Sequence, residues 1–270
     1  MRLHSCYQFM QSIRGRQRFI ACLAFAFVFS IAGTANGLEI LYSDNFNGSS
    51  SSDLAGTTPD TTIGSNTWQG DTGFKADGSA TGVVGGIYLP FTPSAGAIYT
   101  ITASFTTASS STGWMGVGFS ESSPTSTNPF NTGGRGWVIV NKDINHFQSF
   151  VGPGTATGAS GGIVNPVNQL STITISLNAM DSNVANWTYS STLRVNTTDY
   201  TVWTNVNANI SSASQIQSLG MSAFNGSGQY TSFSVVPEPA GLVLGIVASI
   251  LVAFRPGFRK RFSIAGRRKV

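Results

Sequence analysis

Residues 99–106 have the sequence Tyr99-Thr100-Ile101-Thr102-Ala103-Ser104-Phe105-Thr106, with apolar or small residues at odd positions and hydroxyl residues at even ones. Successive side chains of a β-strand point to opposite faces, so this alternation predicts a strand with one buried face and one solvent-facing face. The same period of two recurs in residues 172–177 and 187–195. Together these stretches predict antiparallel sheets with polar outward faces.

One further stretch lacks this alternation. It is Gly136-Trp137-Val138-Ile139-Val140, which is apolar on both sides and predicts a strand buried on both faces. No helical period occurs between residues 38 and 235, and the longest loops are expected at 152–168 and 121–134. We expect eleven or twelve strands, at 38–46, 66–74, 82–89, 97–107, 113–120, 135–141, 145–151, 170–178, 185–195, 199–205, 217–224 and 228–235. Many short strands predict an all-β domain, an antiparallel β-sandwich or jelly roll, over residues 38–235.

The net charge of +4 belongs to the two ends of the chain. Residues 38–235 carry four basic and ten acidic side chains, a balance of −6, whereas residues 255–270 alone carry seven basic ones. The middle of the chain is therefore acidic, and nucleic acid is not an expected partner. Both cysteines, Cys6 and Cys22, precede residue 38, so the predicted domain contains no thiol and no disulfide.

The N-terminal region predicts export. A run from Phe19 to Ala32, apolar apart from Ser30, follows three arginines and is followed by the small residues of Ala35-Asn36-Gly37. A basic segment, an apolar run and small residues at a cleavage point are typical of a secretory signal peptide. We expect residues 1–37 to be this signal, with signal peptidase cutting after Gly37 or Ala35.

The C-terminal region, residues 236–270, predicts a membrane address. Residues 240–254 contain no charge, and a basic stop follows them, formed by Arg255, Arg259, Lys260 and Arg261. A helix over 240–254 would be about 22 Å long, short of the ~30 Å hydrocarbon core unless the basic side chains snorkel to the interface. The basic tail at 255–270 is expected to stay in the cytoplasm, which places the β domain outside. An ordinary single-pass anchor is the alternative.

Before this span stand Val236, Pro237, Glu238 and Pro239, in which the prolines disfavour helix and favour an extended backbone. With the short apolar span and the arginine-rich end, the region 236–261 resembles the PEP-CTERM sorting signal of exported bacterial proteins. The resemblance implies an exosortase-like membrane enzyme as processing partner. It also implies a location in the cell envelope at least transiently, and then on the cell surface or outside the cell.

The domain itself resembles concanavalin A-like (laminin G-like) jelly rolls. The segment Leu54-Ala55-Gly56-Thr57-Thr58-Pro59-Asp60-Thr61, followed by Trp68 and Gly78, is similar to a segment of bacterial cell-surface members, and Gly220–Asn225 also fits. The resemblance implies that the first strand, near Asp44, lies beside the last strand, at 229–235.

Catalytic groups are scarce in the predicted domain. Its only glutamates, Glu39 and Glu121, have no carboxylate two or four residues away, as a retaining glycosidase on one strand would need. Its only histidine, His146, is interpreted as a structural strand or turn residue. No enzyme activity, cofactor or metal is therefore expected, although oxygen ligands for a calcium ion could come from Asp44, Asn45, Asp60 and Asp77.

Ligand binding is a stronger hypothesis than catalysis. Trp68, Trp114 and Trp203 are the candidate ligand-binding residues, because their rings could stack on sugars near loops; the alternative is that they pack in the core, as expected for Trp137 and Trp187. We expect an exported cell-surface or matrix protein with a structural or adhesive β-sandwich. A carbohydrate-binding module for exopolysaccharide is the first alternative, and a glycosidase-like enzyme is the second.

Overall fold

The computed structural model describes residues 39–80, 82–108, 113–121, 133–141, 145–152, 161–226 and 228–239. Apart from two short 3-10 helices, η2 (Val184–Asn186) and η3 (Ala213–Gln215), the regular structure in these residues is β-strand. The strands form two sheets, and the strand pairs within each sheet are antiparallel. The predicted all-β class and two-sheet antiparallel architecture are confirmed.

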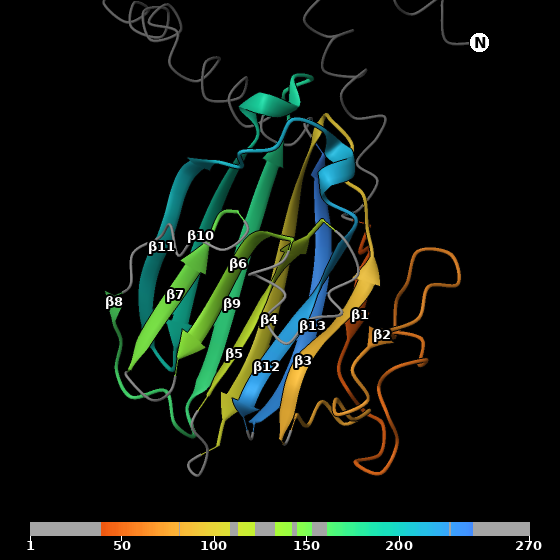
Figure 1. Ribbon diagram of the computed structural model, residues 1–270, viewed down its shortest axis with the longest axis vertical. Coiled ribbons are helices and arrows are strands. Elements are labelled where there is room, and N and C mark those ends of the chain that lie inside the picture. The colour runs from red at the N-terminus through yellow and green to blue at the C-terminus, as the bar shows by residue number, and fades with distance from the viewer. Residues whose placement is uncertain are drawn as a thin grey trace, which may run out of the picture. The chain divides into compact units, whose positions relative to one another are not determined.

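The six-stranded sheet has the order β1 (Tyr42–Asp44), β13 (Gly228–Pro239), β4 (Ala97–Thr107), β9 (Leu170–Ala179), β10 (Thr188–Val195) and β11 (Thr198–Asn207). The seven-stranded sheet has the order β2 (Gln69–Gly70), β3 (Val83–Pro90), β12 (Ser218–Gly226), β5 (Trp114–Ser120), β6 (Gly134–Asn141), β7 (His146–Phe150) and β8 (Gly161–Gly162). In Figure 1 the seven-stranded sheet faces the viewer and the six-stranded sheet lies behind it.

Each predicted strand has an observed counterpart, but two are much shorter than expected. The predicted strand at 38–46 is reduced to β1, because the Asp44 side chain accepts a hydrogen bond from the Phe46 N–H and Phe46 adopts a positive φ of 51°. The predicted strand at 66–74 is reduced to β2, because Asp71 closes a tight turn by accepting the Gly73 N–H at 2.7 Å. The short strand β8 lies within the loop predicted at 152–168.

The core lies between the two sheets and is built from the apolar positions of the alternating strands. In β4 the residues Ile101, Ala103 and Phe105 are fully buried, while the hydroxyl residues between them are partly exposed. The predicted central strand is also confirmed: β6 lies between β5 and β7, and Trp137 to Val140 are buried on both faces. Trp187 is buried as predicted.

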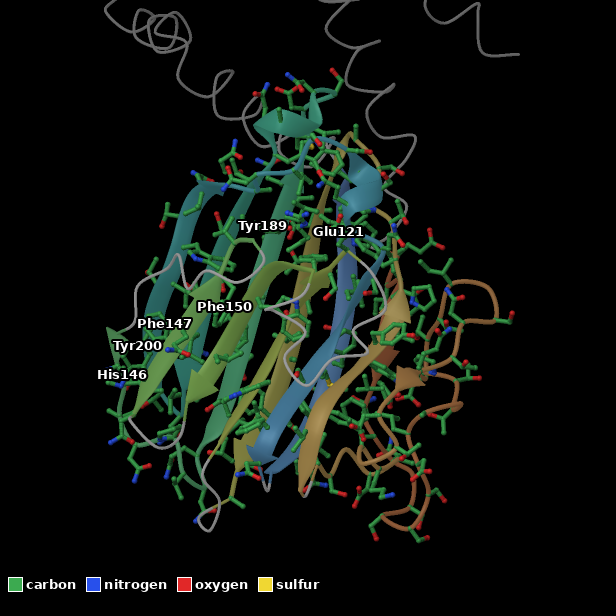
Figure 2. The ribbon with its side chains drawn as sticks, in the orientation of Figure 1. Glu121, His146, Phe147, Phe150, Tyr189 and Tyr200 are labelled. Carbon is green, nitrogen blue, oxygen red and sulfur yellow. The ribbon has the colours of Figure 1, made fainter. Side chains whose placement is uncertain are left out.

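Three buried tyrosines of the six-stranded sheet donate hydrogen bonds to backbone carbonyls of the other sheet. Tyr42 of β1 donates to the Pro90 oxygen at 2.5 Å, and Tyr230 of β13 donates to the Gly116 oxygen at 2.8 Å. Tyr189 of β10 donates to the carbonyl of Arg135, whose side chain pairs with Glu121; Figure 2 labels Tyr189 and Glu121. Burial raises the pKa of all three phenols above the usual value for tyrosine, so the hydroxyls stay protonated.

The first and last strands lie side by side, as the resemblance to concanavalin A-like domains implied. Tyr42, Ser43 and Asp44 are opposite Val235, Ser234 and Phe233. The last strand then continues past the predicted domain boundary at residue 235. Val236, Pro237, Glu238 and Pro239 remain paired with β4, opposite Thr100 to Ala97.

The prolines are compatible with this pairing because of where their backbone groups point. The carbonyl of Val235 accepts a hydrogen bond from the Leu41 N–H at 2.9 Å, so the backbone groups of Val235 face the β1 side. With a period of two, Pro237 and Pro239 face the same side, beyond the end of the β1 pairing. Proline lacks an N–H and is tolerated at such an open edge.

The predicted signal peptide at 1–37, the predicted transmembrane helix at 240–254 and the basic stop at Arg255, Arg259, Lys260 and Arg261 lie outside the described residues. Within the residues that are described, no helix has the length and apolar character needed to cross a membrane.

Candidate binding site

Trp68 is fully buried in the main core, just before β2. Its ring packs edge-on against Phe233 with centroids 5.2 Å apart, and its indole Nε1–H donates to Asp44 Oδ2 at 2.7 Å. Trp68 therefore links the segment before β2 to strand β1, and its ring faces other core residues.

Trp114 and Trp203 occupy different parts of the sandwich. Trp114 of β5 stacks on Phe224 at 6.0 Å, in a small cluster with Trp137, Ile139 and Phe150 that is separate from the main core. Trp203 of β11 belongs to the main core and packs near Tyr189. Each of the three predicted tryptophans is less than a tenth exposed, and the structure does not bring them together on one surface. Their positions match the alternative interpretation of core packing.

Several of the oxygen atoms considered for calcium accept hydrogen bonds from the protein. Both carboxylate oxygens of Asp44 accept protein donors, from the Phe46 N–H and the Trp68 indole. Asp60 Oδ2 accepts the backbone N–H and the side-chain amide of Asn45, and Asp77 Oδ1 accepts two donors from Ser79. In the part of the chain that the structure describes, no group of three or more His, Cys, Asp or Glu side chains could hold a metal ion.

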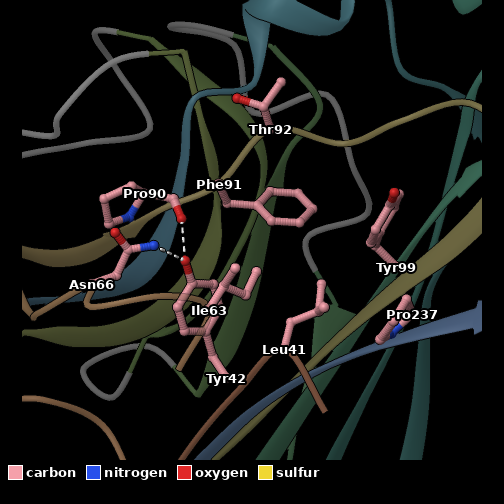
Figure 3. Close-up of a pocket in the computed structure, with 9 residues that line it drawn as sticks. All are labelled: Leu41, Tyr42, Ile63, Asn66, Pro90, Phe91, Thr92, Tyr99 and Pro237. Carbon is pink, nitrogen blue, oxygen red and sulfur yellow. Dashed lines mark hydrogen bonds between the residues drawn. The ribbon is translucent and has the colours of Figure 1, made fainter. Parts of the chain in front are cut away.

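A pocket of about 550 Å³ lies where the β1–β13 edge meets the end of β3 (Figure 3). Its size falls within the roughly 300–1,000 Å³ of ordinary ligand sites. Aromatic, aliphatic and uncharged polar side chains line it: Leu41, Tyr42, Ile63, Asn66, Pro90, Phe91, Thr92, Tyr99 and Pro237.

The aromatic part of the pocket is held rigidly. Phe91 and Tyr99 pack edge to face, with centroids 5.1 Å apart and an interplanar angle of 75°. The Tyr99 hydroxyl accepts the N–H of Ser94 at 2.9 Å. Tyr42 donates to Pro90 and accepts from Asn66 Nδ2 at 2.7 Å, as Figure 3 shows. Each of the three rings is less than a tenth exposed, so only a small part of it can meet a ligand, and the rings need little reordering when one binds.

The polar part of the pocket is small and neutral. The amide of Asn66 donates through Nδ2 to the Tyr42 hydroxyl, and its Oδ1 is an acceptor that this bond does not use. Thr92 is exposed and contributes a hydroxyl that can both donate and accept. None of the nine lining residues carries a formal charge.

Sequence reasoning did not find this pocket. Of its lining residues, Pro237 was predicted to belong to the sorting motif and Tyr99 to an alternating strand, and none was predicted to bind a ligand. Apart from Pro237, the lining residues come from the segments 41–42, 63–66, 90–92 and 99, which are brought together only by the pairing of β1 with β13 and by the end of β3. No local spacing marks such a site.

Comparisons with known proteins give similarity at the level of structure only. No family model matches the chain, and no curated protein matches it. Among solved structures, it is similar to the carbohydrate recognition domain of Emp47p, with 15% identity and a TM-score of 0.42 over 76% of this chain and 98% of that one. It is also similar to the lectin UEA-II complexed with galactose, with 10% identity and a TM-score of 0.41 over 69% and 86% of the two chains. A third is the carbohydrate-binding module CBM66 from Bacillus subtilis, with 11% identity and a TM-score of 0.37 over 57% and 83%.

Proposed function

We propose that this chain is an exported β-sandwich protein that binds a neutral carbohydrate in the pocket formed by Tyr42, Phe91 and Tyr99. The observation that carries the proposal is the combination of rigid aromatic rings with amide and hydroxyl groups in a pocket without charge. Binding, not catalysis, is the proposed activity.

The chemistry of a sugar matches this lining. A pyranose ring has C–H groups on its faces, which pack on aromatic side chains, and hydroxyl groups at its edge, which bind amides and hydroxyls. An anionic ligand would lose its hydration here without gaining an opposite charge, which is unfavourable. The pocket therefore favours neutral saccharides over uronic acids or phosphates.

We also propose that this two-sheet antiparallel domain is a concanavalin A-like jelly roll. The side-by-side arrangement of β1 and β13 supports this proposal.

Export and sorting remain proposals that rest on the sequence. The predicted signal peptide, the motif at Val236 to Pro239 and the apolar span at 240–254 support delivery to the envelope and processing by an exosortase-like enzyme. Cell fractionation of the chain carrying Pro237→Ala with Glu238→Ala tests this proposal. Altered retention or processing would support it, and unchanged retention and processing would count against it.

Glycan binding by the full-length chain in mild detergent tests the pocket. We expect binding to neutral oligosaccharides in a panel that also contains acidic ones. Thr92→Trp, which fills the exposed rim of the pocket, should weaken this binding at least about tenfold, the effect of roughly 1.4 kcal/mol. The matched control is Thr72→Trp, at an exposed threonine outside the pocket lining, and it should bind like the wild type. Absence of binding to every neutral glycan would refute the proposal.

A further inference from the structure

The outward face of the six-stranded sheet carries an unbroken row of hydroxyl side chains. Strand register places Ser43 opposite Ser234, and Ser234 opposite Thr102. Thr102 is opposite Thr174, Thr174 is opposite Thr192, and Thr192 is opposite Thr201. The row therefore has one hydroxyl residue on each of the six strands, and all of its members are at least partly exposed.

Two flanking rows continue the pattern. On one side the row is Val236, Thr100, Ser176 and Ser190, and on the other it is Ser232, Ser104, Thr172, Arg194 and Asp199. Twelve of the fifteen positions in the three rows are Ser or Thr. A protein surface usually carries about 25–35% charged residues, so this face is unusually rich in hydroxyls and poor in charge.

The two charged residues in the three rows neutralise each other. Arg194 Nε and Nη2 contact Asp199 Oδ1 and Oδ2 at 2.6 and 2.8 Å. The next carboxylate, Glu238, is opposite Ile98 at the end of the face, beyond these rows. A neutral partner with many hydroxyls therefore matches the face in charge and in hydrogen-bonding capacity, whereas a nucleic acid or an anionic membrane does not.

The face is also regular and preorganised. Neighbouring strands lie about 4.7–4.9 Å apart, and alternate residues along a strand lie about 6.6–6.8 Å apart, so the hydroxyls form a two-dimensional array. Threonine is stiff at χ1, and cross-strand hydrogen bonds join Thr100 to Ser176 and Ser104 to Thr172, both at 2.9 Å. Each hydroxyl keeps further capacity to donate or accept.

We propose that this hydroxyl face is a second binding surface, separate from the pocket, and that it takes the surface of an extended neutral polysaccharide. Individual contacts would be weak, since a hydroxyl exchanges water for a sugar hydroxyl with little net gain. Adsorption would come from many such contacts made at once across a rigid array. Pro237 lines the pocket, whereas its neighbour Val236 belongs to the hydroxyl face, so the two surfaces lie on opposite sides of β13.

Sedimentation with insoluble neutral glycans tests this proposal. The full-length chain in mild detergent is mixed with microcrystalline cellulose, chitin or an insoluble β-1,3-glucan, at low and at high salt. We expect adsorption to at least one of the three that is little changed by salt, because charges contribute little to it.

Variants then locate the surface. The pair Thr102→Val with Thr174→Val keeps the side-chain shape but removes two central hydroxyls, and should weaken adsorption about tenfold. The control pair, Thr72→Val with Thr197→Val, alters two exposed threonines outside the rows and should adsorb like the wild type. If the first pair does not fold, Thr174→Arg serves instead, since it places a bulky cation in the middle of the array and should also reduce adsorption.

The pocket-blocked variant Thr92→Trp separates the two surfaces. It should adsorb normally even where it has lost binding to soluble oligosaccharides. Loss of adsorption in Thr92→Trp, wild-type adsorption by the Thr102→Val and Thr174→Val pair, or no adsorption of the wild type to any of the three glycans would each overturn the proposal.

Discussion

The hydroxyl group of Tyr230 in β13 donates to the carbonyl oxygen of Gly116 in β5 at 2.8 Å, across the interior of the sandwich. The Tyr230 hydroxyl oxygen also lies 2.9 Å from the carbonyl oxygen of Ser222, and it accepts the backbone N–H of Gly116 at 3.1 Å. One hydroxyl from the six-stranded sheet therefore contacts three backbone groups of the other sheet: its single proton is shared between two carbonyls, and its oxygen accepts one N–H. Buried backbone groups without partners are costly, so this contact should contribute strongly to stability.

Tyr230→Phe should lower the free energy of unfolding by about 2–4 kcal/mol, because it leaves buried carbonyl and N–H groups unsatisfied while preserving the ring. Tyr88→Phe is the control, since Tyr88 of β3 is partly exposed, and its effect should stay within about 0.5 kcal/mol. Urea unfolding of the full-length chain in detergent measures both. Equal effects of the two substitutions would show that the three contacts of Tyr230 do not stabilise the fold.

Asp44 should make stability depend on pH. Burial raises the pKa of its carboxyl group, against hydrogen bonds from Trp68 and Phe46 that lower it. Because the folded-state pKa is raised, the contribution of the Asp44 carboxyl group to stability is complete below the unfolded-state pKa of about 3.9. This contribution is lost as pH rises through the folded-state pKa. Relative to the wild type, Asp44→Asn should therefore gain stability as pH rises from about 4 to 7. Unfolding curves taken across this range measure the difference, and parallel pH profiles would contradict the prediction.

Gly78 should tolerate no side chain, because a Cβ there would lie 2.0 Å from the carbonyl oxygen of Tyr230. Gly64 is the matched control, since both glycines have positive φ, of 80° and 63°, but no atom lies within 4 Å of a Cβ at Gly64. Gly64→Ala should cost about 1–2 kcal/mol from backbone strain alone. Gly78→Ala should cost about 1–3 kcal/mol more from the clash. Thermal unfolding measures the loss of stability in each variant. Equal losses would mean that the backbone around Gly78 moves away from the added side chain freely.

Trp68→Phe should destabilise the fold without changing saccharide affinity. It removes the indole donor to Asp44 together with part of a buried ring, for about 2–4 kcal/mol in total. Trp203→Phe is the control, because within the described residues the Trp203 indole nitrogen has no hydrogen-bond partner, so only volume is lost. Unfolding and glycan titration of both variants measure the two effects. A selective loss of glycan affinity in folded Trp68→Phe would restore Trp68 as a ligand residue.

The sequence predicted the sheets well because their pattern is local. In β4 and β9 the alternation of apolar and hydroxyl residues decides both the strand and its orientation. The two short strands were overestimated because side chains compete with the ladder there: Asp44 and Asp71 each accept a backbone N–H two residues further along the chain. Such local bonds end a strand without changing its hydrophobic pattern.

The binding surfaces could not be predicted in the same way. The hydroxyl row was visible on single strands, but its continuity depends on register, which for Thr102 and Thr174 joins residues far apart in the chain. The pocket depends on Tyr99 meeting segments near Tyr42 and Phe91, and aromatic residues alone indicate only burial. For this reason the sequence pointed to three tryptophans, whereas the pocket is lined by two tyrosines and a phenylalanine, which are likewise less than a tenth exposed.

Hydroxyl-radical footprinting of the full-length chain, with and without the neutral oligosaccharide that binds best, tests the pocket most directly. We predict lower oxidation of the exposed Ile63 and the half-buried Leu41 and Pro237 when the sugar is bound, and unchanged oxidation of Val164 and Met180, which are exposed outside the pocket. Protection of Val164 or Met180 in place of the lining residues, or no protection at saturating sugar, would contradict a carbohydrate site in this pocket.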